Sequence, residues 1–340
     1  MPGRRLPLGE AGTNAGTALE DRGGGWAPGH CRLDPRTEVR FGDLMPLTNL
    51  VTCKRAEKLL SHLSRRGVYF PDSKRGDWIF RGHADWDWKL VPRALRDDVE
   101  LLDRSGQWDA RLPSANSVQK QQELEHATIR EFFWRADRAG LGLPGDSPEL
   151  RLLMRSYDEA LRGDAFDWPP DFALALLALA QHHGVPTRLL DWTFNPLVAA
   201  YFAASDPKTD GLLGIWALET KAITGPIPSR AMSAYFGLPS DRKPEFQLVT
   251  APAVGNLYLR AQEGAFVLHR PQVHGPINRG KEQLVVKPLQ EIPHGPSMQL
   301  FTLPRTEAPK LLRLLALDGI DGSQLRPDYA GIARSIMEHP

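Results

Sequence analysis

The centre of the chain holds its most informative stretch, which reads Gln181-His182-His183-Gly184-Val185-Pro186-Thr187-Arg188-Leu189-Leu190-Asp191-Trp192-Thr193. Two imidazoles, a guanidinium, a carboxylate and a hydroxyl lie within these thirteen residues. The flanking segments 172–180 and 196–204 are apolar enough to form buried helices. Polar groups between core elements are costly to desolvate unless they pair or bind a ligand. The stretch therefore predicts a functional site between two core helices.

Composition excludes several classes of protein. The 340 residues include 42 basic and 41 acidic side chains, a net charge of +1, so no global field favours nucleic acid or an anionic membrane. The two cysteines, Cys31 and Cys53, cannot build a disulfide framework or a cysteine-based zinc site. A reducing, cytoplasmic setting is therefore expected. The sequence has no apolar run of about eighteen residues that could span a bilayer, so no membrane partner is expected.

The pattern along the chain predicts one domain after a disordered leader. Residues 1–40 are rich in Gly, Pro, Arg and Ala and lack an apolar period, which leaves a folded domain over residues 41–340. Apolar periods predict helices over 48–66, 117–138, 171–183, 196–204, 307–317 and 327–337. Strands are expected at 78–80, 212–218, 246–250, 256–260, 265–269, 283–287 and 298–302.

This order of elements predicts the fold class. Helices first and strands later are typical of an α+β domain with a mainly antiparallel sheet, helices packed on it, and a helical N-terminal half. Asp171 is expected to cap the third helix and Gly184 to end it. Asn195 and Pro196 are expected to begin the next helix.

Each charged candidate has a structural and a functional interpretation. Arg81, which follows the strand at 78–80 and precedes Gly82, either holds a phosphate or pairs with a buried carboxylate that fastens the strand. His182 and His183 either cap the helix or line the site, but neighbouring positions on a helix cannot chelate one metal ion. No metal ligand is predicted.

Two further features leave alternatives open. Arg188 and Asp191 are three residues apart, a spacing that allows an ion pair across a turn, and Asp191 is expected to pair with Arg188 or Arg81. Glu263 is the only acidic residue from 246 to 280. Such a carboxylate at a strand start is either a solvated edge charge or a catalytic acid.

The motifs together resemble the FRG domain family. The resemblance rests on Phe80-Arg81-Gly82, Leu90-Val91-Pro92-Arg93, the block 181–204, the segments 256–266 and 310–320, and Pro327-Asp328-Tyr329-Ala330-Gly331. It extends over about residues 45–338. It implies a bacterial protein from a defence or toxin setting, but little chemistry.

Part of the pattern is also similar to ADP-ribosyltransferases. In that family an Arg-Gly strand end binds the phosphates of NAD, a Ser-Thr-Ser strand precedes a helix, and a later glutamate serves the nicotinamide ribose. Arg81-Gly82, Asp191-Trp192-Thr193 and Gln262-Glu263 follow this order, although Asp191 and Trp192 replace Ser and Thr. The sequence lacks a glycine-rich dinucleotide fingerprint, which excludes a Rossmann site.

The resemblance implies a nucleotide-directed enzyme that takes NAD or a similar ligand and modifies an unknown macromolecule. Its expected site residues are Glu263, Gln262 and Asp191 in catalysis, and Arg81, Gly82, His182, His183, Arg188 and Thr193 in ligand binding. Gln262 competes with Glu263 because the FRG pattern carries a glutamine there. A non-catalytic nucleotide- or nucleic-acid-binding module and a structural interaction domain are the alternatives.

Overall fold

Seven strands form one sheet in the computed structural model, which describes residues 48–64, 68–70, 73–74, 76–96, 98–103, 105–109, 118–156, 168–206, 210–223, 246–250, 257–270 and 298–338. The strands are β1 (Thr48–Thr52), β2 (Trp78–His83), β5 (Leu189–Thr193), β6 (Leu212–Glu219), β7 (Phe246–Val249), β8 (Gly264–His269) and β9 (Met298–Pro304). They lie in the order β1-β9-β6-β2-β5-β8-β7. Only β1 and β9 are parallel, so the α+β class with a mainly antiparallel sheet is confirmed. A separate hairpin joins β3 (Leu101–Leu102) to β4 (Trp108–Asp109).

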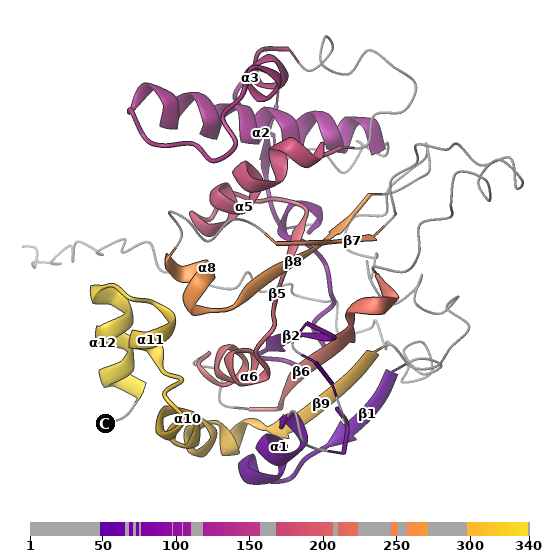
Figure 1. Cartoon of the computed structure of the whole chain (residues 1–340), viewed down its shortest axis with the longest axis vertical. Coiled ribbons are helices and arrows are strands. Elements are labelled where there is room, and N and C mark those ends of the chain that lie inside the picture. The colour runs from indigo at the N-terminus through magenta and orange to yellow at the C-terminus, as the bar shows by residue number, and fades with distance from the viewer. Residues whose placement is uncertain are drawn as a thin grey trace, which may run out of the picture. The chain divides into compact units, whose positions relative to one another are not determined.

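The sheet has a weak seam between β2 and β5. Strand β2 pairs with β6 over the six residues of Trp78–His83, and β5 pairs with β8 over the five residues of Leu189–Thr193. Between β2 and β5, however, the only pair is Phe80 with Thr193. Figure 1 shows β6, β9 and β1 running side by side, while β5 crosses them in another direction. Backbone groups along this seam must therefore find partners outside the ladder.

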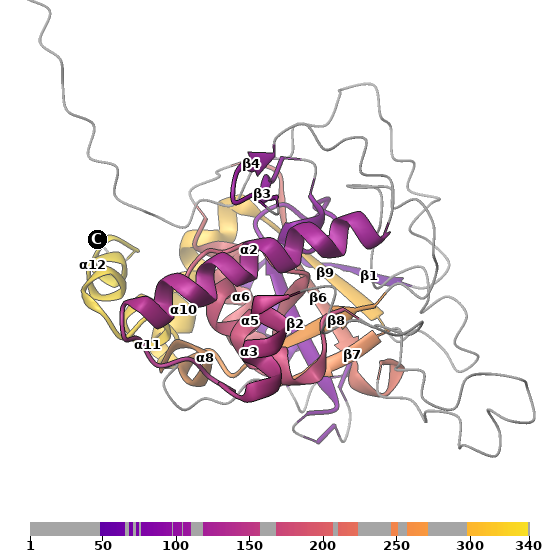
Figure 2. The same cartoon turned by 90° about the horizontal axis from the view of Figure 1, so that it is seen from above.

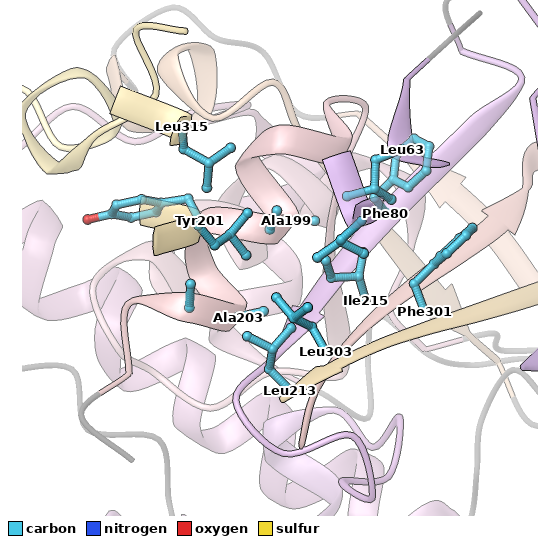
Figure 3. Close-up of a cluster of buried hydrophobic side chains, with 14 of the residues drawn as sticks. Leu63, Phe80, Ala199, Tyr201, Ala203, Leu213, Ile215, Phe301, Leu303 and Leu315 are labelled. Atoms are coloured by element: carbon cyan, nitrogen blue, oxygen red, sulfur yellow. The ribbon is translucent and has the colours of Figure 1, made fainter. Parts of the chain in front are cut away.

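Six of the described helices pack in two groups against the sheet. The described helices are α1 (Ala56–Leu63), α2 (Val118–Arg138), α3 (Pro148–Arg155), α5 (Leu174–His182), α6 (Pro196–Ala204), α8 (Leu257–Ala261), α10 (Ala308–Leu317), α11 (Gly322–Leu325) and α12 (Tyr329–Glu338), with short 3-10 turns at Arg93–Leu95, Asp171–Ala173, Thr220–Ala222 and Arg305–Glu307. Helices α1, α6 and α10 share one core with β2, β6 and β9 (Figure 3). Helices α2, α3 and α5 share another with β5, β7 and β8 (Figure 2).

Helices α5 and α6 are buried because their sequences are apolar on nearly every side. The backbone N–H of Leu197 donates to the Asn195 side chain at 3.0 Å, and Pro196 occupies the first turn, as predicted for the start of α6. Gly184 follows α5 with a φ of +84°, a conformation that glycine adopts without steric cost. Both ends of the segment 183–195 are thereby fixed by local signals in the sequence.

Several elements differ from the sequence predictions. Residues 48–52 form β1 rather than the start of a helix, because their backbone pairs with β9 and the helix begins only at Ala56. Residues 257–261 form α8 rather than a strand, since the N–H of Gln262 donates to the Tyr258 carbonyl at 2.8 Å. The N-terminal half is also not wholly helical, because it supplies β1 and β2 to the sheet.

The remaining predictions concern a helix cap, two segments of the chain and membrane helices. Asp171 opens a 3-10 turn without capping it, and its carboxylate accepts a 2.8 Å hydrogen bond from the buried Arg270 guanidinium. The expected leader at 1–40 and the expected strand at 283–287 lie outside the described residues. Among the helices that the structure describes, none is long and apolar enough to cross a membrane.

Candidate functional site

The tripeptide Phe80-Arg81-Gly82 sends its side chains to two faces of the sheet. Side chains alternate along a strand, so Phe80 and Gly82 share one face and Arg81 lies on the other. Phe80 packs in the core with α6 (Figure 3). A Cβ atom on Gly82 would lie 1.9 Å from the Ala199 carbonyl oxygen and 2.8 Å from the Ala203 nitrogen, both in α6. The close backbone approach that Gly82 permits is therefore used by α6.

Arg81 bridges the seam between β2 and β5. Its Nη1 donates to the carbonyl oxygen of Asp191 at 2.6 Å, and its Nε donates to Nε2 of His83 at 2.9 Å. The same Nη1 lies 3.8 Å from a carboxylate oxygen of Asp191. If the β2–β5 ladder continued past Phe80, Gly82 would face Asp191. The guanidinium thus satisfies a carbonyl that the diverging strands leave without a ladder partner.

The pairing of Arg81 with Asp191 is loose. The Arg81 side chain is 15% exposed, whereas that of Asp191 is 43% exposed. The Asp191 carboxylate also accepts from the Gln181 amide, whose oxygen accepts from the Thr187 hydroxyl. Asp191 therefore contacts both Arg81 in β2 and Gln181 in α5.

Burial dominates the electrostatics around Arg81. It lowers the pKa of Arg81 to about 10, with Arg96 adding to this effect and Asp191 opposing it. Burial also holds the pKa of His83 well below its ordinary value, and the charges of Arg81 and Arg96 act in the same direction. His83 is consequently neutral at pH 7. The end of β2 carries a buried positive charge that is only partly compensated.

The two histidines at the end of α5 differ in their surroundings. The ring of His182 lies 4.5 Å from that of Tyr258 in α8 and 5.0 Å from that of His183, which is exposed. Burial lowers the pKa of His182, as do the charges of His183 and Arg326, while Asp191 raises it. His182 therefore lies between the candidate groups of β5 and the C-terminal helices. No group of histidine, cysteine and acidic residues suited to a metal ion occurs in the part of the chain that the structure describes.

Gln262 and Glu263, the last of the three segments that resemble ADP-ribosyltransferases, lie directly before β8. Thr193 donates its hydroxyl to the carbonyl oxygen of Gln262 at 2.7 Å, and Asn195 donates its side-chain amide to the Glu263 carboxylate at 3.1 Å. Glu263 has a φ of +46°, a left-handed conformation that is uncommon for residues other than glycine. The Gln262 amide donates to the carbonyl oxygen of Leu325 at 3.1 Å. Both candidate side chains are thus held by neighbouring elements.

Comparison with known proteins identifies a domain in this part of the chain. Residues 76–211 match the model of the FRG domain. The chain therefore contains an FRG domain over these residues. No match was found among the curated proteins or the solved structures. The matched part of the FRG domain runs from before β2 to after α6, so it holds Arg81, Asp191 and Thr193, whereas Gln262 and Glu263 lie beyond it.

Arg188 lies apart from the other charged candidates of the FRG domain. Its Nε and Nη2 donate to the two carboxylate oxygens of Glu125 in α2, at 2.6 and 2.8 Å, and its Nη1 donates to the His269 carbonyl at 3.4 Å. The side chains of Arg188 and Glu125 are 1% and 2% exposed. The expected contact between Arg188 and Asp191 does not form, because positions three apart in an extended chain are about 10 Å apart.

Glu125 was not among the candidates from the sequence. It lies within an expected helix, and a charged side chain beside the buried Leu124 is the signal that could have identified it. It also accepts hydrogen bonds from the Gln121 amide at 2.9 Å and from the Trp168 indole at 3.0 Å. Four donors therefore saturate this carboxylate, as the burial of a charge requires.

Proposed function

We propose that this FRG domain binds the phosphate of a nucleotide at Arg81. The observation that carries the proposal is the incomplete pairing of a guanidinium whose side chain is only 15% exposed. Nε and Nη1 of Arg81 are engaged by His83 and Asp191, whereas Nη2 makes no hydrogen bond within the described residues. Arginine binds phosphate strongly because its planar donors match the anion, and low dielectric strengthens the contact. A phosphate would compensate the charge that Asp191 balances only in part.

The finer proposal is that the nucleotide is NAD or a similar ligand and that the domain transfers ADP-ribose. Its support is the arrangement of three elements similar to those of ADP-ribosyltransferases. Phe80, Thr193 and Gly264 form one row across neighbouring strands β2, β5 and β8. Arg81 follows the first residue of that row, and Glu263 precedes the last. Adjacent strands lie about 4.8 Å apart, so this register supports the proposal that one extended ligand touches both groups.

Each group has a distinct role in this proposal. The positively charged nicotinamide of NAD takes the electron pair of the glycosidic bond and leaves as neutral nicotinamide, so positive charge develops on the ribose. A nucleophile of the target macromolecule, or water, then bonds to the ribose carbon and loses its proton. Glu263 stabilises that charge, and a fixed carboxylate is effective because it needs no reorganisation. Asn195 holds Glu263, Thr193 holds the backbone of Gln262, and Arg81 binds the pyrophosphate. The backbone carbonyl of Asp191 positions Arg81.

Calorimetric titration with NAD, followed by measurement of released nicotinamide, tests both levels of the proposal. Arg81→Ala is expected to weaken NAD binding. Glu263→Gln is expected to keep NAD affinity but to lower nicotinamide release about a hundredfold, the usual loss when one transition-state contact is removed. Arg313→Ala, on α10, is the matched control. Full activity in Glu263→Gln together with inactivity of Gln262→Ala would instead assign the role to the glutamine.

A binding module without turnover is the second candidate. It is favoured by the engagement of both candidate catalytic side chains in the fold, Gln262 with Leu325 and Glu263 with Asn195. NAD binding without nicotinamide release would select this candidate. Binding of an oligonucleotide but not of NAD would change the ligand class, and the absence of both would leave a structural interaction domain.

A further inference from the structure

Arg326 has an unusual environment for a half-buried arginine. It ends α11, and its guanidinium makes no hydrogen bond or ion pair with any residue that the structure describes. Two other arginines in the C-terminal part of the chain are bonded to the fold. Arg305 donates to the Ala203 carbonyl at 2.6 Å, and Arg334 donates to the Ser205 carbonyl at 2.5 Å and to Glu338 at 2.8 Å. The absence of partners at Arg326 is therefore a local property of this one side chain.

The backbone around Arg326 is tied to the candidate site. The carbonyl of the preceding residue, Leu325, accepts from Gln262, and the Tyr258 hydroxyl donates to the Asp328 carboxylate. Tyr258 in turn lies against His182. Figure 1 shows α11 beside α8, in agreement with these contacts. In the sheet, β5 lies between β2, which carries Arg81, and β8, which follows Gln262 and so the contact with Leu325.

The acidic groups nearest to Arg326 are already engaged. Asp328 accepts from Tyr258 and, at 2.6 Å, from the N–H of Gly331. Glu338 accepts from the Tyr201 hydroxyl at 2.9 Å and from Arg334. Burial lowers the pKa of Arg326, and the positive charge of Arg334 acts in the same direction. The fold holds a positive charge here without neutralising it by direct contact.

We propose that Arg326 is a second anion-binding residue and that the ligand is a dinucleotide with two separate phosphate groups. Arg81 binds the pyrophosphate, and Arg326 binds a further phosphate on a ribose. This inference rests on the proposed function. Its chemical basis is that the Arg326 guanidinium makes no hydrogen bond or ion pair within the described residues, that Arg81 is only loosely paired with Asp191 at 3.8 Å, and that arginine is the usual partner of a ribose phosphate.

NAD and NADP distinguish this proposal because they differ only in the ribose phosphate. Calorimetric titration of the full chain is expected to show NADP binding at least tenfold tighter than NAD. Arg326→Gln is expected to remove that preference, and Arg326→Lys is expected to retain part of it. Equal affinities for NAD and NADP in the parent chain, unaltered in Arg326→Gln, would overturn the inference while leaving the proposed function intact. Binding of neither ligand would contradict the proposed function itself.

Thermal unfolding without ligand supplies a second readout. Removal of an unpaired, half-buried charge is expected to leave the melting temperature unchanged or to raise it. The matched variant Arg334→Gln loses two hydrogen bonds and is expected to lower it. If Arg326→Gln lowered the melting temperature as much as Arg334→Gln, Arg326 would be a structural residue and the inference would be wrong.

Discussion

Arg188 and Arg81 lie at neighbouring strands of one sheet, yet the fold pairs them in opposite ways. Arg188 meets Glu125 through two short hydrogen bonds in a site where both side chains are at most 2% exposed. Arg81 reaches the Asp191 carboxylate only at 3.8 Å, and that carboxylate is 43% exposed. A saturated ion pair has no donor or acceptor left for a ligand, whereas a loosely paired guanidinium does. The contrast separates an architectural arginine from a candidate binding residue.

The largest effect is expected at the saturated pair. Glu125→Gln leaves the Arg188 guanidinium buried without a counter-charge, and its free energy of unfolding is expected to fall by about 3 to 5 kcal/mol. Urea denaturation measures this loss. The exposed pair Arg135 and Glu131, 2.7 Å apart on α2, gives the matched control, because Glu131→Gln is expected to cost under about 1 kcal/mol.

A double variant sharpens this first prediction. Glu125→Gln combined with Arg188→Met leaves no uncompensated charge, so it is expected to be more stable than Glu125→Gln alone. A double variant that is less stable than the single one would show that Arg188 contributes mainly through packing.

The second prediction concerns the pH dependence of stability on the Arg81 side. The folded pKa of His83 lies well below 6.5, whereas the unfolded chain takes up a proton near that pH. The unfolded state therefore binds more protons just below pH 6.5, and stability is lost as the pH falls through this range. One proton contributes about 1.4 kcal/mol per pH unit.

Urea denaturation from pH 7 to pH 5 tests this slope. His83→Gln is expected to flatten it by one proton, and His182→Gln is the comparison because burial also lowers the pKa of His182. An unchanged slope in His83→Gln would show that this imidazole does not resist protonation in the folded state.

The smallest effect is expected at the loose pair. Asp191→Asn is expected to change the free energy of unfolding by under about 1 kcal/mol, because the carboxylate is 43% exposed and lies 3.8 Å from the guanidinium. The same substitution is expected to tighten phosphate binding severalfold, since it removes the negative charge that competes for Arg81. Calorimetry with ADP measures this gain. A stability loss as large as that of Glu125→Gln would remove the distinction between the two arginines.

Local signals in the sequence were sufficient for much of the fold. Asn195-Pro196 predicted the start of α6, Gly184 predicted the end of α5, and the alternation of apolar runs after residue 211 predicted β6, β8 and β9. These features depend on hydrogen bonds and backbone conformations within a few residues, which the sequence specifies directly. The Phe80-Arg81-Gly82 motif likewise identified the strand that carries the candidate anion site.

Contacts between distant segments were decided only by the tertiary structure. The sequence suggested Arg188 as a partner for Asp191, three residues away, but the fold gave Arg188 to Glu125, 63 residues away. The reason is that a strand sets neighbouring side chains on opposite faces, while the packing of α2 brings a carboxylate to the buried face. The same holds for Gly82. Only glycine fits at this position because the backbone of α6 passes too close for a Cβ atom. Arg326 became a candidate because the fold half-buries it without a hydrogen-bond partner among the described residues, a property that no local pattern encodes.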